Sequence, residues 1–165
     1  MTWHPAERQI PGPFAWKDAL EEDLGHDPDG RRFAAIAERM LTGRYYPPDA
    51  LEFFGPWDRL EVGDRILQRA RLIPSLRSPG LWAMTEVHLA ELSEHECALG
   101  YLTTKHHFGR GIWIARLSRT SERLTLRVEA FTTPHSIWFW IGFPYARWLQ
   151  LRAWRRAVEV FGNVT

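Results

Sequence analysis

The apolar positions of residues 29–43 recur at spacings of three and four residues, which is the period of an amphipathic helix. Asp29 can cap the start of this helix, and Gly43 stands where it would end. The inward positions are Phe33, Ile36, Ala37, Met40 and Leu41. Residues 1–28 contain early prolines and predict an extended arm, in which the segment around Trp16 forms a strand or a short helix.

After Gly63 the hydrophobic period changes from 3.6 toward two, which is typical of half-buried strands. The segment 124–131 is the clearest, because Leu, Leu, Val and Ala alternate there with Thr, Arg, Glu and Phe. The expected strands are 64–73, 81–92, 95–103, 111–118 and 124–131. The later connections are short enough for hairpins, so the pattern predicts an antiparallel sheet with one covered face.

Pro134 ends the strand pattern, and the remainder of the chain is helical in character. An apolar turn near residues 137–141 leads into a long segment from Pro144 to Phe161. The apolar stripe is Leu151, Trp154, Ala157, Val158 and Phe161, and the opposite stripe is Arg152, Arg155, Arg156 and Glu159. We therefore expect one α+β domain over residues 1–165, with a long C-terminal helix laid across a curved antiparallel sheet.

Composition excludes several classes of protein. The 165 residues carry a formal net charge of +1, which argues against a nucleic-acid partner. The longest apolar stretch, residues 137–143, is too short for a transmembrane segment. Residues 1–17 lack an apolar signal core, and the single Cys97 fits a reducing compartment, so we expect a cytoplasmic protein. The nine Trp and nine Phe residues suit either a thick core or an aromatic-lined pocket.

Two motifs carry a resemblance to a known family. Residues 100–111 read Gly-Tyr-Leu-Thr-Thr-Lys-His-His-Phe-Gly-Arg-Gly, and residues 128–134 read Val-Glu-Ala-Phe-Thr-Thr-Pro. With the element order, they resemble the uncharacterised DUF1990 family of the START-like (SRPBCC) helix-grip superfamily. The positions that match the family's pattern are Tyr101, Thr103, His107, Gly111, Ala130, Phe131 and Pro134.

The resemblance implies a bent sheet that wraps the last helix and leaves a cavity for an apolar ligand. One departure from the family pattern concerns charge. Gly109, Ile112 and Trp113 stand where the family tends to have carboxylates, so any reaction or cation that depends on those groups is lost here.

The direction of the strand over residues 81–92 decides what lines such a cavity. If the face with Trp82 and Met84 points inward, the Glu86 carboxylate and the His88 imidazole lie in an aromatic cavity. If the other face points inward, Val87 and Leu89 fill the interior. The predicted ligand-binding residues are Trp82, Met84, Glu86, His88, Tyr101, Trp113, Trp140 and Trp154. Thr103, His107 and Gly111 form the predicted loop motif.

Motifs for other chemistry are missing from the sequence. His106 and His107 are adjacent, so on an extended segment their side chains point to opposite sides and do not readily share a metal ion. His88, Glu94, His95 and Cys97 do not match a metal-binding spacing. We predict no metal, no cofactor and no catalytic residue.

Three hypotheses follow for the function. The leading one is a small-molecule-binding protein whose cavity takes an apolar or aromatic ligand. The second is an acid–base enzyme that uses Glu86, His88 or His107 on a hydrophobic substrate in the same cavity. The third is an interaction module in which Trp148, with Trp138 or Trp140 and nearby arginines, contacts a partner or a membrane surface.

Overall fold

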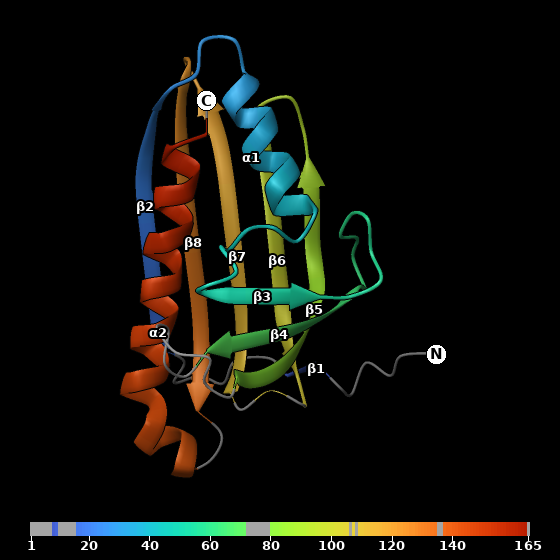
Figure 1. Ribbon diagram of the computed structural model, residues 1–165, viewed down its shortest axis with the longest axis vertical. Coiled ribbons are helices and arrows are strands. Elements are labelled where there is room, and N and C mark those ends of the chain that lie inside the picture. Colours follow the sequence, from blue (N-terminus) through green and yellow to red (C-terminus); the bar gives the residue numbers. More distant parts are fainter. Residues whose placement is uncertain are drawn as a thin grey trace.

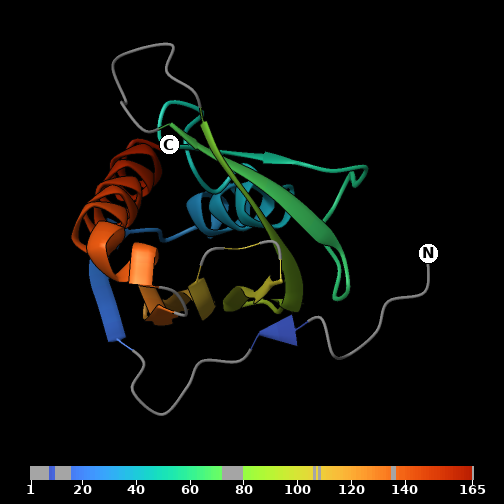
Figure 2. The same cartoon turned by 90° about the horizontal axis from the view of Figure 1, so that it is seen from below.

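The chain folds into a curved antiparallel sheet with two helices on its concave side, as the computed structural model in Figures 1 and 2 shows. The structure describes residues 8–9, 16–71, 80–105, 107, 109–134 and 137–164. The strands are β1 (Arg8–Gln9), β2 (Trp16–His26), β3 (Leu51–Phe54), β4 (Arg65–Arg71), β5 (Gly80–Leu92), β6 (Glu96–Thr104), β7 (Gly109–Thr120) and β8 (Arg123–Pro134). The helices are α1 (Arg31–Leu41) and α2 (Ile137–Gly162). The predicted α+β class is confirmed.

Consecutive hairpins build most of the sheet. The strand order is β2-β8-β7-β6-β5-β4-β3, and every pairing is antiparallel. The short β1 pairs with the end of β6. In Figure 2 the sheet bends around α1 and α2, so both helices lie inside its curve.

Residues 16–26 form β2 at the edge of the sheet. Of the two alternatives predicted for the segment around Trp16, a strand or a short helix, the strand is confirmed. This strand pairs with β8 from Trp16 opposite Thr132 to His26 opposite Arg123. The period-two pattern is weak because most β2 side chains are exposed and the register shifts between Asp23 and Gly25. The four-residue β3 was not predicted. It is too short to show a period.

The first turn of α1 is capped by a residue further from the helix than the sequence pattern predicts. Asp27 is 1% exposed, and its carboxylate accepts the backbone N–H groups of Arg32 at 3.1 Å and Phe33 at 2.9 Å. The expected cap, Asp29, accepts the N–H of Arg31 at 3.2 Å. Arg119 of β7 donates to the Asp27 carbonyl at 2.9 Å, which fixes this turn against the sheet.

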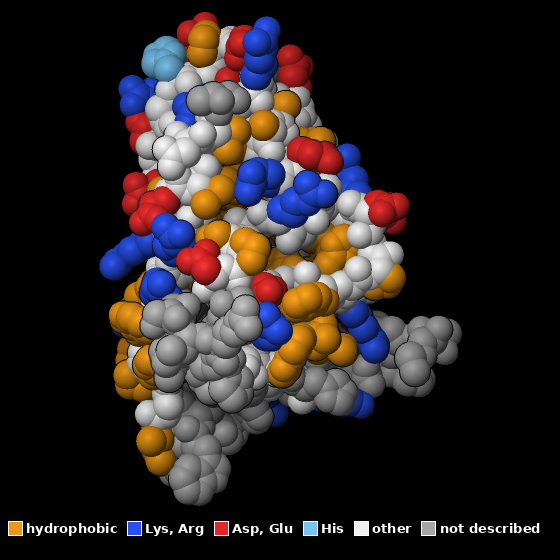
Figure 3. Space-filling model, viewed as in Figure 1, with side chains coloured by type: hydrophobic (Ala, Val, Ile, Leu, Met, Phe, Trp, Pro, Cys, Tyr) orange, Lys and Arg blue, Asp and Glu red, His pale blue; other side chains and the backbone are white. Residues whose placement is uncertain are grey.

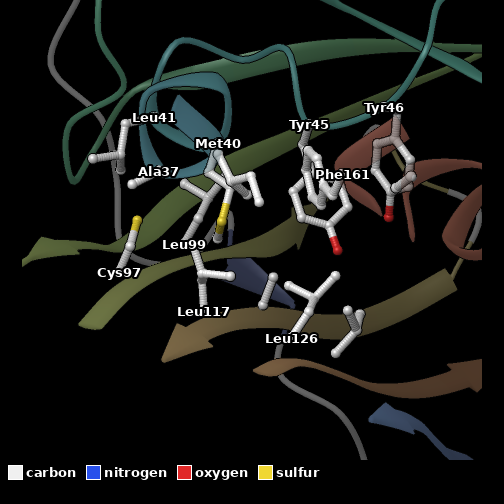
Figure 4. Close-up of a cluster of buried hydrophobic side chains, with 14 of the residues drawn as sticks. Ala37, Met40, Leu41, Tyr45, Tyr46, Cys97, Leu99, Leu117, Leu126 and Phe161 are labelled. Carbon is white, nitrogen blue, oxygen red and sulfur yellow. The ribbon is translucent and has the colours of Figure 1, made fainter. Parts of the chain in front are cut away.

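The hydrophobic core lies between α1, the C-terminal half of α2 and the inner face of the sheet. Figure 4 shows Met40 of α1 pointing toward Leu99 and Leu117 of the sheet. The predicted inward stripes of both helices are confirmed, since Ile36, Met40, Trp154, Ala157 and Phe161 are at most 1% exposed. Side chains therefore fill the space between the sheet and the C-terminal half of α2.

Candidate functional site

A cavity of about 180 Å³ lies between α2, the inner face of the sheet and the segment that leads into β3. Small side chains leave this space open. Six alanines line it, and they come from β4, β5, β8, α2 and the segment before β3. They are Ala50, Ala70, Ala83, Ala130, Ala146 and Ala153. In Figure 3 hydrophobic side chains gather over β3 and β4, on the side of the molecule where this cavity lies.

One wall of the cavity is formed by aromatic rings that pack on one another. Tyr101 and Trp113 are direct partners across β6 and β7, and their rings stack with centroids 4.7 Å apart and planes at 15°. Tyr46 packs against Trp113 at 6.1 Å. Tyr45 supports the same indole from behind in an edge-on contact at 4.9 Å. The rings therefore hold one another in place before any ligand binds.

One edge of the cavity is polar. Gln68 of β4 is 6% exposed and donates from Nε2 to the hydroxyl of Thr85 at 3.0 Å. The Tyr101 hydroxyl is hydrogen-bonded to the side chains of Gln68 and Tyr46. Burial raises the pKa of Tyr101 far above its usual value, so the phenol stays protonated even in moderate alkali. A tyrosine hydroxyl can both donate and accept, so Tyr101 offers this edge a polar group that can bind a polar atom of a ligand.

The loop motif closes the cavity where β6 and β7 meet. The Thr103 hydroxyl accepts the N–H of Gly111 at 2.8 Å, and Nδ1 of His107 accepts the N–H of Gly109 at 3.1 Å. A side chain at Gly111 would place its Cβ 2.8 Å from the carbonyl oxygen of Phe131, so only glycine fits there. Thr103, His107 and Gly111 all line the cavity, and their hydrogen bonds fix its end.

An ion pair and an aromatic contact attach the cavity-lining part of α2 to the edge strand β2. Arg147 binds the carboxylate of Asp18, with Nη2 2.6 Å from Oδ1. Phe143 packs on Trp16 with ring centroids 5.6 Å apart. Both α2 residues line the cavity, so these contacts set the distance between the helix and the sheet at this end.

The structure brings together part of the predicted site. Tyr101, Trp113 and Trp154 line the cavity together with the three loop-motif residues. The side chain of Trp140 lies outside the described part of the structure.

Four of the predicted ligand-binding residues stand on the outer face of β5, away from the cavity. Leu81 and Ala83 line the cavity, so the residues that alternate with them point the other way. These outward residues are Trp82, Met84, Glu86 and His88. Trp82 is 47% exposed and packs on Phe54, and the His88 ring lies against Gly100 on the outer face. Of the two alternatives for this strand, Val87 is the residue inside.

Several lining residues were not predicted. Gln68 carried a signal, because it is a polar residue on the strand face that also presents Ile66 and Ala70. The alanines of β4, β5 and β8 can be recognised as a group of small lining residues only when the order of the strands in the sheet is known. Tyr46 carried no such signal, since its position depends on how the segment before β3 crosses the sheet.

Neither a metal-ligand cluster nor a membrane-spanning helix occurs among the described residues. Within the described residues, no group of three or more His, Cys, Asp and Glu side chains is placed to hold a metal ion. Among the described residues, no helix is long and apolar enough to cross a membrane.

Comparisons with known proteins agree on the fold. A hypothetical protein, jhp0584, from Helicobacter pylori superposes with a TM-score of 0.62 at 14% identity, covering 99% of both chains. Ginseng major latex-like protein 151 from Panax ginseng superposes at 0.56 and 9% identity, covering 89% of this chain and 97% of that one. Protein CV1439 from Chromobacterium violaceum superposes with a TM-score of 0.56 at 13% identity, covering 90% of this chain and 96% of that one. At such identities the likeness shows the fold alone.

The sequence comparisons concern the family. A search of curated proteins gives no match. The model of the family described as a domain of unknown function, DUF1990, matches residues 4–160, which is nearly the whole chain. The predicted resemblance and the predicted helix-grip fold are both confirmed, and the chain belongs to the DUF1990 family.

Proposed function

We propose that this protein binds a small, largely apolar molecule in the cavity beside α2. The observation that carries the proposal is an aromatic-walled space of about 180 Å³ that six alanines leave unfilled. This space is partly open to solvent and is lined mainly by apolar side chains, so a ligand can enter it and bury apolar surface there. An apolar cavity of about 150 Å³ is already large enough to take benzene.

The lining defines the chemical class of the ligand. The volume fits a single ring with a short substituent, and the stacked Tyr101 and Trp113 offer flat apolar surface to it. The polar edge at Gln68 and Tyr101 suits one hydrogen-bonding group on that ring. A substituted phenol or an aromatic ketone meets both conditions. For about eight non-hydrogen atoms we expect a dissociation constant of about 10 µM.

The acid–base alternative has less support. Glu86 and His88 lie on the outer face of β5, and the described lining contains no carboxylate. His107 lines the cavity, but its Nδ1 is engaged with the backbone N–H of Gly109. Binding without chemistry is the function that these residues support best.

Calorimetric titration with toluene, phenol, 4-methylphenol and acetophenone tests the proposal. The wild type should bind at least one of these compounds, and Ala83→Leu, which fills the cavity, should weaken that binding by about tenfold or more. Ala34→Leu is the matched control, because Ala34 is exposed on α1. Ala153→Leu is a second filling variant in case the first unfolds. Failure of all four compounds to bind, or equal binding by the filled variants, would overturn the proposal.

A further inference from the structure

The face of α2 that points away from the sheet carries an ordered stripe of exposed and half-buried side chains. Its members recur at spacings of three and four residues, which places them on one side of the helix. They are Ile141, Tyr145, Trp148, Arg152 and Arg155. Ile141 is 69% exposed, Tyr145 45% and Trp148 50%, although three such residues would normally be at least partly covered.

The side chains of this outer stripe are arranged before any partner binds. The rings of Tyr145 and Trp148 stack with centroids 5.6 Å apart and planes at 20°. The guanidinium of Arg152 lies 6.0 Å from the centroid of the Trp148 ring. The stripe therefore passes from aliphatic through amphipathic aromatic to cationic along the helix.

The charge of α2 is one-sided. Residues 137–158 contain four arginines and no Asp or Glu, while the whole chain carries a formal charge of only +1. Arg147 is paired with Asp18, and Arg156 with Asp49 and Glu159. Within the described residues, Arg152 and Arg155 have no ion pair, so their charges are available to an anionic partner.

The apolar end of the outer stripe lies toward the N-terminal end of α2, which is at the bottom of Figure 1. We propose that this stripe docks on the surface of an anionic lipid bilayer. Trp and Tyr favour the headgroup level of a bilayer, where their rings meet apolar chains and their polar atoms meet water. The cations of Arg152 and Arg155 then face anionic headgroups.

Docking of this kind puts the helix on the bilayer, with its axis near the interface. No helix within the described residues is suited to cross a membrane, so α2 would lie in the interfacial plane. The inner face of the same helix lines the cavity through Phe143, Ala146 and Leu149. The docking site itself uses none of these three, so it stands whether or not the cavity binds a ligand.

Sedimentation with vesicles tests the inference. The wild-type protein should bind phosphatidylcholine vesicles that contain phosphatidylserine about tenfold more strongly than vesicles of phosphatidylcholine alone. Added salt should weaken the binding, because the attraction is electrostatic. Arg152→Glu and Trp148→Ala should each reduce it by about tenfold. Circular dichroism checks that both variants keep the fold.

Trp82→Ala is the matched control, because Trp82 is 47% exposed but lies in a different cluster with Phe54 and Arg69. It should bind vesicles like the wild type. Failure to bind anionic vesicles, or an equal loss in the control, would overturn the inference. A dimer that Trp148→Ala dissociates, seen by light scattering, would also overturn it, since the outer stripe would then be a contact between protein copies.

Discussion

The guanidinium of Arg147 forms a bidentate ion pair with the carboxylate of Asp18. Nε lies 2.9 Å from Oδ1 and 3.1 Å from Oδ2, and Nη2 lies 2.6 Å from Oδ1. The two residues are far apart in the sequence, and the pair joins the edge strand β2 to the helix that lines the cavity. Asp18 is only 9% exposed, so water competes little for its side of the contact.

Removing this ion pair should lower the stability of the protein, but the protein should still fold. Asp18→Ala should lower the free energy of unfolding by about 1–2 kcal/mol, a value reduced by the partial exposure of Arg147. Urea denaturation of Asp18→Ala, Arg147→Ala and the double variant gives the coupling between the two side chains. Asp23→Ala is the control, because its pair with Arg123 is exposed. Additive effects of the two single substitutions would contradict the assigned contact.

The buried Cys97 predicts a loss of stability in alkali. Burial raises the pKa of this thiol to about 11 from an ordinary value of 9.0. At about pH 8 and below, the thiol is mostly protonated in the folded and the unfolded state and contributes almost nothing to the pH dependence. From pH 9 to about 11 only the unfolded chain loses the proton, so stability falls as pH rises, by about 1 kcal/mol near pH 9.5.

Denaturation of the wild type and of Cys97→Ala at pH 8 and about pH 9.5 measures this effect. The variant loses packing and should be less stable at both pH values, but its stability should change less between them. The buried tyrosines also lower the stability in alkali, but both proteins contain them, so their contribution cancels in the comparison. An identical pH dependence of the two proteins would contradict the assignment.

Tyr101 should select for ligands that carry a hydrogen-bonding group. Tyr101→Phe keeps the ring that stacks on Trp113 but removes the hydroxyl at the polar edge. We expect this change to weaken 4-methylphenol about tenfold and to leave toluene within about twofold. Calorimetric titration with the two compounds measures the difference. Equal losses for both would show that the hydroxyl supports the fold and does not contact the ligand.

Local pattern was enough to predict much of the fold. The periods of residues 29–43 and 124–131 gave α1 and β8 because one face of each is buried and the other is wet. Asp27 was missed as the cap of α1 because the chain turns at Gly30, with φ at 74°, and so brings an earlier carboxylate back to the helix. For the edge strand β2 the sequence left a strand and a short helix as alternatives, because exposure removes the alternation that marks a strand.

The candidate site was less predictable, because it depends on strand direction. Tyr101 and Trp113 were predicted to bind a ligand, and they meet across β6 and β7 on the cavity side. The alternation in β5 leaves two faces that look similar, and the residues with the more reactive side chains, Glu86 and His88, lie on the outer one. The position of β5 between β4 and β6, and the register shift between Val87 and Leu89, decide this direction.

Amide chemical shifts recorded while 4-methylphenol is added test the central claim most directly. The account predicts saturable shifts at cavity residues such as Ala83, Tyr101, Trp113 and Ala153, and their loss in Ala83→Leu. Residues of the filled core, such as Leu117, should move little. Shifts confined to the exposed face of α2, or no saturable shift at any concentration, would contradict a ligand-binding cavity.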